Sequence, residues 1–337
     1  MADVARRAGV TKSTVSHVIN RTRTVSPETI AAVEQAMREL AYVPNTLARS
    51  LAMATTNTVG LVISSLTNIY FSDLIVSIEN ACTRLGLMVF LADPADDPAK
   101  ELALVRALHQ RRVDGVMLAP SADPHQRAIR YLRENAVPSV LLDRLVSAEF
   151  DQVGVENTNA VKRLIDHLVG HGHRRIGMVS NQMGLMTATE RIKGYKLGLE
   201  SNGIEWKDEL LELGRDEMAA NIEATRRLLN LTDRPTAIVT GNNLSTIGAL
   251  QAIQERHLRI PQDIALVGFD DFQWADLFQP RLTLISQPIK QIGETAANML
   301  VERMANPARP PRTIRLETSL VIRESCGCNM ERFPPAT

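Results

Sequence analysis

The alternation of short apolar runs with helical stretches from residue 58 onward constrains the fold more than any other feature of the sequence. Strand-like apolar runs lie at 59–63, 88–92, 116–119, 140–142, 176–179, 237–240, 264–269 and 282–285, with helical periodicity between them at 73–85, 100–111, 160–171, 190–202 and 244–256. Strands that are apolar on both faces and alternate with helices predict parallel sheets covered by helices. There are too many strands for one small sheet, so we expect two doubly wound parallel sheets, with ligands binding at the carboxyl ends of the strands.

The first forty residues show a different pattern, which predicts helices alone. A short helix over 2–8 ends at Gly9, and Thr11 can cap a second helix that runs to about Asn20. Ser26 and Pro27 supply an N-cap and a proline in the first turn of a third helix. A small all-α domain therefore precedes the α/β core, and a length of 337 residues suits one small and one larger domain.

Charge is distributed unevenly although the formal net charge is zero. Residues 1–56 hold seven Lys or Arg against four Asp or Glu, and the remaining residues hold 31 against 34. A basic end on an acidic body is typical of a polyanion-binding domain joined to a sensor. Three cysteines are too few for a disulfide framework, and no apolar run is long enough for a membrane span or a signal peptide, so we expect a cytoplasmic protein with no membrane partner.

The first two predicted helices, with Gly9 in the turn between them, form a helix-turn-helix pattern. In this motif the second helix enters the major groove of DNA and its early residues meet base edges. Lys12, Ser13 and His17 can donate to base acceptors, and the hydroxyls of Thr11, Thr14 and Ser16 suit phosphate oxygens. The alternative is that this polar face is only the solvated side of an ordinary helical pair.

The motifs within this stretch resemble the headpiece of the lac repressor (LacI/GalR) family. The matching segments are Val4-Ala5, Ala8-Gly9-Val10, Thr14-Val15-Ser16, Asn20, Val25-Ser26, Tyr42-Val43-Pro44-Asn45 and Ala48-Arg49-Ser50-Leu51. His17 in the segment 14–20 is similar to the purine and ribose repressors within that family. The resemblance continues through the core to about Ser325, and it implies a core like that of the periplasmic sugar-binding proteins.

The resemblance assigns roles to single residues of the headpiece. Lys12, Ser13 and His17 become base readers, and Thr11, Thr14, Ser16 and Asn20 become contacts to the DNA backbone. Residues 45–52, including Asn45 and Arg49, become a hinge helix that folds on operator binding. Leu51 becomes the wedge that unstacks a base step in the minor groove, the alternative being an ordinary core leucine. Two departures are Ala52, which stands where the purine and ribose repressors have Lys, and a first helix that begins later than in most members.

The same resemblance predicts the domain boundaries and the assembly. We expect a headpiece at 1–43, a hinge helix and linker at 44–57, a core at 58–325 and a tail at 326–337. The first lobe of the core takes 58–156 and 288–325, and the second takes 157–287. Residues 244–250 resemble part of the family's subunit interface, and the tail shows no heptad pattern, so we expect a homodimer without a tetramerising helix.

A cleft between the lobes is predicted from polar residues at strand ends that match the family's ligand contacts. They are Tyr70, Phe71, Asp143, Arg191, Asn242, Asp270 and Gln287. Carboxylate, guanidinium and amide groups can fork onto neighbouring hydroxyls. The alternative is that Asp and Asn after strands are turn formers or helix caps. Asp216 stands where the family usually has an aromatic residue, which favours a sugar or sugar derivative over a purine as effector.

Other candidate chemistries are weaker. His167, His171 and His173 approach metal-ligand spacing, but we interpret them as a helix end running into the next strand. Cys326-Gly327-Cys328 lacks the second cysteine pair of a typical zinc site. Asp270-Asp271 has no accompanying nucleophile, so we expect no catalytic activity, cofactor or metal.

The sequence therefore predicts a transcription regulator, of the repressor type, that binds operator DNA and responds to a small-molecule effector. The alternative is a sugar-binding or sugar-processing protein of the same α/β architecture that does not act on DNA.

Overall fold

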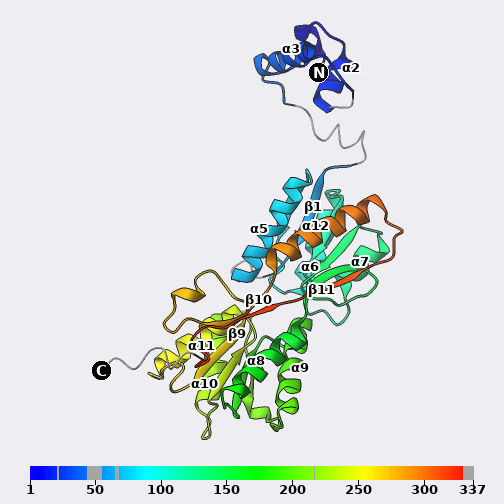
Figure 1. The fold of residues 1–337 in the computed structure, drawn as a ribbon. Coiled ribbons are helices and arrows are strands. Elements are labelled where there is room, and N and C mark those ends of the chain that lie inside the picture. The colour runs from blue at the N-terminus through cyan, green and yellow to red at the C-terminus, as the bar shows by residue number, and fades with distance from the viewer. Residues whose placement is uncertain (21–22, 44–54, 65–67, 216, 329–337) are drawn as a thin grey trace. The chain divides into compact units, whose positions relative to one another are not determined.

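The computed structural model describes residues 1–20, 23–43, 55–64, 68–215 and 217–328 (Figure 1). The chain divides into two compact units, Met1–Thr56 and Asn57–Thr337. Among the described residues, no helix combines the length and the apolar character needed to cross a membrane.

The described residues of the smaller unit form three helices, α1 (Ala2–Ala8), α2 (Lys12–Asn20) and α3 (Pro27–Glu39). Gly9 ends α1 in the left-handed conformation at φ 66°, which glycine adopts without steric cost. The Thr11 hydroxyl accepts a hydrogen bond from the Thr14 backbone N–H at 3.1 Å, and the Ser26 hydroxyl accepts one from Thr29 at 3.3 Å. The helix boundaries predicted from caps are thereby confirmed.

A small core holds these three helices together. Val4, Ala5, Val15, Val33 and Ala36 are buried at the centre, and the remaining apolar side chains around them are only partly covered. Because few large side chains are buried, this unit gains little from the hydrophobic effect compared with the larger one.

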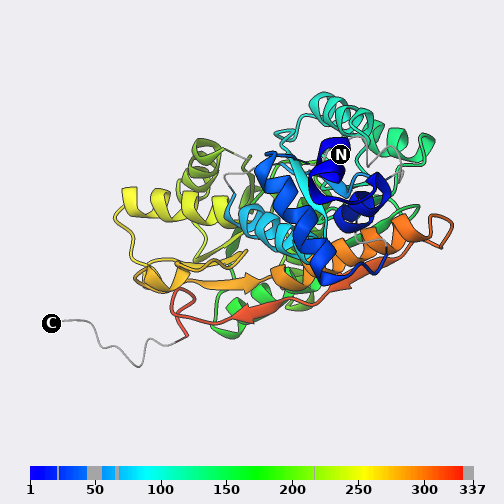
Figure 2. The same cartoon turned by 90° about the horizontal axis from the view of Figure 1, so that it is seen from above.

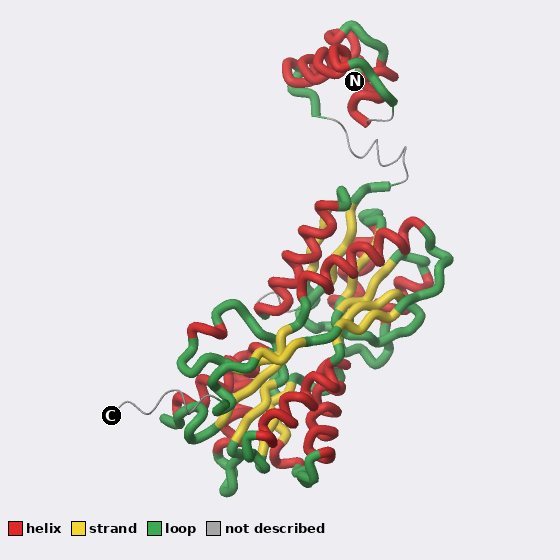
Figure 3. The backbone as a smooth tube through the Cα atoms, viewed as in Figure 1, coloured by secondary structure: helices red, strands yellow, loops and turns green. Residues whose placement is uncertain are grey.

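The larger unit contains two six-stranded sheets, each the centre of one lobe (Figure 3). The first sheet has the order β11-β5-β4-β3-β1-β2 and is parallel throughout. Its strands are β1 (Thr58–Val62), β2 (Met88–Ala92), β3 (Gly115–Leu118), β4 (Ser139–Leu142), β5 (Asp151–Val155) and β11 (Thr313–Leu316). The predicted doubly wound α/β core is confirmed by this lobe and its partner.

The second sheet has the order β12-β10-β9-β8-β6-β7 and is parallel except for β12. Its strands are β6 (Ile176–Ser180), β7 (Leu211–Leu213), β8 (Ala237–Thr240), β9 (Ala265–Phe269), β10 (Thr283–Ser286) and β12 (Ser319–Val321).

Helices cover both faces of each sheet (Figures 1 and 2). In the first lobe α5 (Ile69–Arg84) and α12 (Ile289–Ala305) pack together on one face, and α6 (Pro98–Gln110) and α7 (Arg127–Glu134) on the other. In the second lobe the pairs are α8 (Asn157–Gly170) with α9 (Met186–Ser201), and α10 (Met218–Leu229) with α11 (Asn243–Glu255). Each lobe thus has three layers, and apolar side chains on both faces of the strands explain this arrangement.

The chain passes between the lobes three times, after β5, after β10 and after β11. The last crossing corrects the predicted lobe boundary, which placed all of 288–325 in the first lobe. β12 pairs antiparallel with β10, Leu284 opposite Val321, and the Ser325 carbonyl accepts from the Leu266 N–H at 2.9 Å. The segment from β12 to Ser325 therefore belongs to the second lobe, because β12 pairs with the otherwise open edge of β10.

Candidate DNA-reading surface and ligand cleft

The polar residues of α2 lie on the side of the helix that faces away from the small core. Thr11, Lys12 and Ser13 are exposed, and Ser16 and His17 are half-buried. The opposite side of the helix carries Val15, which is fully buried. This amphipathic arrangement leaves the predicted base readers at the surface of the unit, as a recognition helix requires.

Several of the predicted backbone-contact side chains also bond to one another. The Thr11 hydroxyl lies 2.8 Å from the Ser13 hydroxyl and 2.9 Å from that of Thr14. The amide nitrogen of Asn20 donates to the Ser16 hydroxyl at 3.1 Å. These bonds fix the rotamers of short side chains before any DNA contact is made. The predicted hinge helix 45–52, with Asn45, Arg49 and Leu51, lies outside the described residues, as does Asp216.

In the first lobe, Tyr70 and Asp143 form the start of the cleft. Asp143 follows β4 in the left-handed region at φ 61°, and Tyr70 lies in the first turn of α5. The Tyr70 hydroxyl donates to Asp143 Oδ1 at 3.0 Å, and both side chains are buried. Desolvation raises the pKa of Tyr70 well above its ordinary value, and the nearby Asp143 and Asp270 carboxylates add to this.

Arg144 is a cleft residue that the sequence reasoning missed, although it directly follows Asp143. Its guanidinium donates to Asp96 Oδ2 at 3.1 Å and to the Pro120 carbonyl at 2.8 Å. Burial lowers the pKa of Arg144, but the carboxylates of Asp96, Asp143 and Glu101 together outweigh burial, and the net pKa is raised. The sequence signal that could have identified it is an arginine directly after an aspartate that ends an apolar strand.

In the second lobe, Asp270 and Gln287 form a bonded pair. Asp270 follows β9 at φ 72° and is almost fully buried, and the Gln287 amide donates to its Oδ1 at 2.6 Å. Burial raises the pKa of the Asp270 carboxyl, and Arg191 and Gln287 oppose that rise. The backbone N–H of Asn243 makes a smaller contribution that also lowers this pKa.

Arg191 lies in α9 and is anchored on three sides. Its Nε donates to Asn157 Oδ1 at 2.9 Å and another guanidinium nitrogen donates to the Gly241 carbonyl at 2.6 Å. The guanidinium carbon also lies 3.7 Å from the centre of the Phe269 ring, within cation–π range. A group held this firmly presents its remaining donors in a fixed direction.

Asn242 caps a helix, which was the alternative to a ligand contact in the sequence analysis. Its Oδ1 accepts from the Ser245 backbone N–H at 2.8 Å, and the Ser245 hydroxyl accepts from the Asn242 N–H at 2.9 Å, which completes a capping box for α11. Its neighbour Asn243 is buried, and neither atom of its side-chain amide has a hydrogen-bond partner. Asn243 is therefore a second missed candidate.

Charges from both lobes act on a single group at the centre of this set. The pKa of Tyr70, from the first lobe, responds to Asp270 and Arg191, from the second. Beside them a cleft is lined by residues of both lobes, namely Asn68, Phe71, Asp96, Arg144, Asn181, Gln182 and Leu185. Within the described part of the chain, Gln287 Oε1 and the Asn243 amide are buried without a hydrogen-bond partner. Arg144 Nε likewise makes no hydrogen bond and lies 3.9 Å from the Asp143 carboxylate. Because unpaired buried polar atoms are costly, these atoms mark where a polar ligand can bind.

A helix-turn-helix unit joined to a two-lobed core with a polar cleft defines the class of ligand-responsive DNA-binding regulators. Residues 1–45 match the model of the bacterial regulatory proteins of the lacI family, and residues 165–326 match that of the periplasmic binding protein-like domain. The chain belongs to the lacI family, which is a family of regulatory proteins and not of enzymes.

Two relatives and one solved structure support this assignment over nearly the whole chain. The HTH-type transcriptional repressor PurR of Mannheimia succiniciproducens is 36% identical over 96% of this chain and 97% of its own. The ribose operon repressor of Escherichia coli K12 is 34% identical over 96% and 99%. The lac repressor dimer bound to operator and the anti-inducer ONPF is 30% identical, covers 96% and 98%, and superposes with a TM-score of 0.86.

Proposed function

We propose that this protein is a repressor that binds a palindromic operator as a homodimer. Its affinity for the operator changes when it binds a sugar or sugar derivative. The observation that carries the effector part is that two buried carboxylates, Asp143 and Asp270, and the anchored guanidinium of Arg191 all act on the same buried hydroxyl, that of Tyr70. Operator binding places its site of action in the cytoplasm.

In the DNA complex, Lys12, Ser13 and His17 contact base edges in the major groove, and Thr11, Thr14, Ser16 and Asn20 contact the DNA backbone. The exposed start of α2 supports this assignment, because the N-terminal residues of a recognition helix reach the bases. Asn45, Arg49 and Leu51 belong to the proposed hinge helix.

The effector is a small, hydroxyl-rich molecule. Vicinal hydroxyls can donate to Asp143 and Asp270, Arg191 and Gln287 can bind further oxygens, and Tyr70 and Phe71 supply an aromatic wall. The tilted contact between these two rings, with centroids 5.0 Å apart, supports a wall of fixed shape. A screen of sugars, sugar acids and purines by thermal shift tests this, since a ligand at 100 times its Kd stabilises by about 2.7 kcal/mol. Stabilisation by purines alone would contradict the proposed effector class.

Apolar side chains at the outer edge of the first sheet support the homodimer. β2 is an edge strand, and Met88, Phe90 and Leu91 are 63%, 41% and 45% exposed. In the second lobe, Leu244, Ile247 and Leu250 form a partly exposed stripe along α11. An exposed apolar edge strand is a liability unless a partner covers it.

Light scattering tests the dimer, with Phe90→Glu as the disrupting variant and Glu79→Gln on the nearby helix α5 as the control. We expect a dimer for the wild type and a monomer for Phe90→Glu, because the new charge would be buried against a copy of itself. A stable tetramer that becomes a dimer when residues 329–337 are deleted would contradict the proposed assembly.

A further inference from the structure

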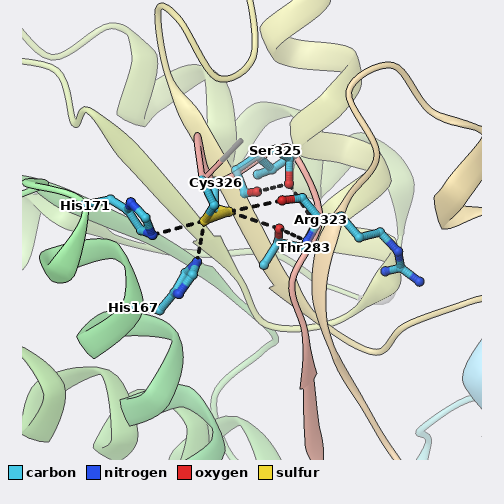
Figure 4. The surroundings of a disulfide bond; sticks show 8 residues. His167, His171, Thr283, Arg323, Ser325 and Cys326 are labelled. Atoms are coloured by element: carbon cyan, nitrogen blue, oxygen red, sulfur yellow. Dashed lines mark hydrogen bonds between the residues drawn. A yellow bond between two sulfur atoms is a disulfide. The ribbon is translucent and has the colours of Figure 1, made fainter. Parts of the chain in front are cut away.

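Two histidines and a cysteine from distant parts of the chain meet on the outer side of the second lobe (Figure 4). Cys328 Sγ lies 3.0 Å from His167 Nε2 and 3.1 Å from His171 Nε2, and all three atoms lie within 4.8 Å of one another. Their spacing in sequence hides this, since Cys328 is 161 residues from His167. No part of the ligand cleft or of the DNA-reading surface uses these residues.

The two histidines come from the end of α8 and the cysteine from the segment that follows β12. His167 and His171 are one helical turn apart, so that their rings lie on the same side of the helix with centroids 4.8 Å apart. His167 and Cys328 are half-buried and His171 is exposed, which gives an ion a route from solvent.

Cys326 takes a different position from Cys328. Its sulfur is fully buried, accepts a hydrogen bond from the Thr283 hydroxyl at 3.2 Å and is joined to Cys328 by a disulfide bond. Gly327 between them adopts φ 88°, a conformation that glycine tolerates best, and so lets the chain turn back on itself. Cys326 is therefore placed as a partner for Cys328 and not as a member of the histidine cluster.

We propose that, when the disulfide is reduced, His167, His171 and Cys328 bind a divalent transition metal ion of the zinc class, with water at the fourth position. Imidazole nitrogen and thiolate sulfur are the ligands that Zn²⁺ prefers, at about 2.0–2.1 Å and 2.3 Å. In tetrahedral geometry these bond lengths separate nitrogen from sulfur by roughly 3.5 Å. The observed separations of 3.0 and 3.1 Å need to open only slightly.

The disulfide and the metal are alternative states of Cys328. A phosphine reductant breaks the S–S bond: the phosphine is oxidised to its oxide with oxygen from water, and the two sulfurs take up the two hydrogens as thiols. Metal binding then displaces the proton of the Cys328 thiol. An added disulfide such as oxidised glutathione re-forms the Cys326–Cys328 bond by thiol–disulfide exchange and is itself reduced to two thiols. This removes the Cys328 thiolate and releases the ion, so the site couples metal binding to the redox state of the pair.

The test is a titration of the full-length protein, reduced with phosphine under argon, with Co²⁺ and then Zn²⁺. We expect about one Co²⁺ per chain, a thiolate-to-cobalt charge-transfer band, and displacement of Co²⁺ by Zn²⁺. Protein whose disulfide is intact should bind neither ion at this site. Less than about a tenth of an equivalent bound by the reduced wild type, or binding without the thiolate band, would overturn the proposal.

Matched variants assign the ligands. Cys328→Ala and His171→Ala should each weaken metal binding by about tenfold or more, and the exposed His125→Ala should leave it unchanged. Cys326→Ala should keep the metal and lose its sensitivity to oxidation, because no disulfide can form with Cys328. Unchanged affinity in Cys328→Ala, or loss of the metal in Cys326→Ala, would overturn the assignment.

Discussion

The DNA-reading surface and the ligand cleft present polar groups in opposite ways. The surface of α2 draws its polar residues from one continuous stretch of ten, 11–20, on a small unit with few buried side chains. The cleft draws on segments from Tyr70 to Gln287, and almost all of its polar groups are buried. Charges in the cleft therefore act in a low dielectric and are held by fixed partners, whereas those of α2 act in water and are screened by salt.

The largest effect is expected on the DNA-reading surface, because a dimer uses each base reader twice. His17→Ala should cost roughly 1–3 kcal/mol per half-site and relax the base preference at one symmetric position. Mobility shifts on a palindrome selected from a random library, and on its single-base variants, measure this. Gln35→Ala on α3 is the control. An equal loss of affinity for every sequence would show that His17 does not read a base.

Substitutions in the cleft should leave operator binding by the headpiece intact but abolish its response to the effector. In Asp270→Ala or Arg191→Ala, the ratio of operator affinities with and without the effector sugar should fall to one, from a coupling that is typically about 1–3 kcal/mol. The reason is that in the proposed complex the effector contacts both lobes, and these two groups are the proposed contacts of the second. The exposed Asp233→Ala serves as the control. If both cleft variants keep the wild-type ratio, the cleft does not bind the effector.

A smaller effect is expected on the pH dependence of effector binding, which the DNA-reading surface should not share. Because burial raises the pKa of Asp270, this carboxylate is protonated at a higher pH than an ordinary aspartate with a pKa near 3.9. Hydroxyls of a sugar donate to the ionised form, so the effector affinity should be full above the raised pKa and fall as the pH drops through it, by at most about tenfold per unit. Calorimetry of the wild type and of Asp270→Asn checks this. A pH profile that is the same in both would assign the dependence to another group.

Local patterns in the sequence predicted those features of both regions that depend on neighbouring residues. Thr11 and Ser26 are typical helix N-caps and predicted where helices begin. The apolar runs before Asp143 and Asp270 predicted that these two residues follow strands. β4 and β9 belong to different sheets, and ligands of such α/β sheets bind at the carboxyl ends of the strands, which is where Asp143 and Asp270 lie.

The elements that the sequence analysis missed depend on tertiary contacts. β11 alternates exposed and half-buried residues, and β12 has only three, so neither shows a long apolar run. Asn242 and Asn243 are adjacent amides, yet only packing decides that the first caps α11 and the second is left unpaired. The contact of His167 with Cys328 has no local signal at all, because it needs α8 and the segment after β12 to be brought together.

The three passages between the lobes also affect how the protein is made. β11 completes the first sheet beside β5, and the Gln152 amide bonds to the Thr313 hydroxyl 161 residues further on. β12 completes the second sheet a few residues later. During synthesis from the N-terminus, the headpiece can form early from its own local contacts, but both sheets keep an open edge until residues 313–321 have left the ribosome. A stop codon after α12 would therefore strip one edge strand from each lobe at the same time.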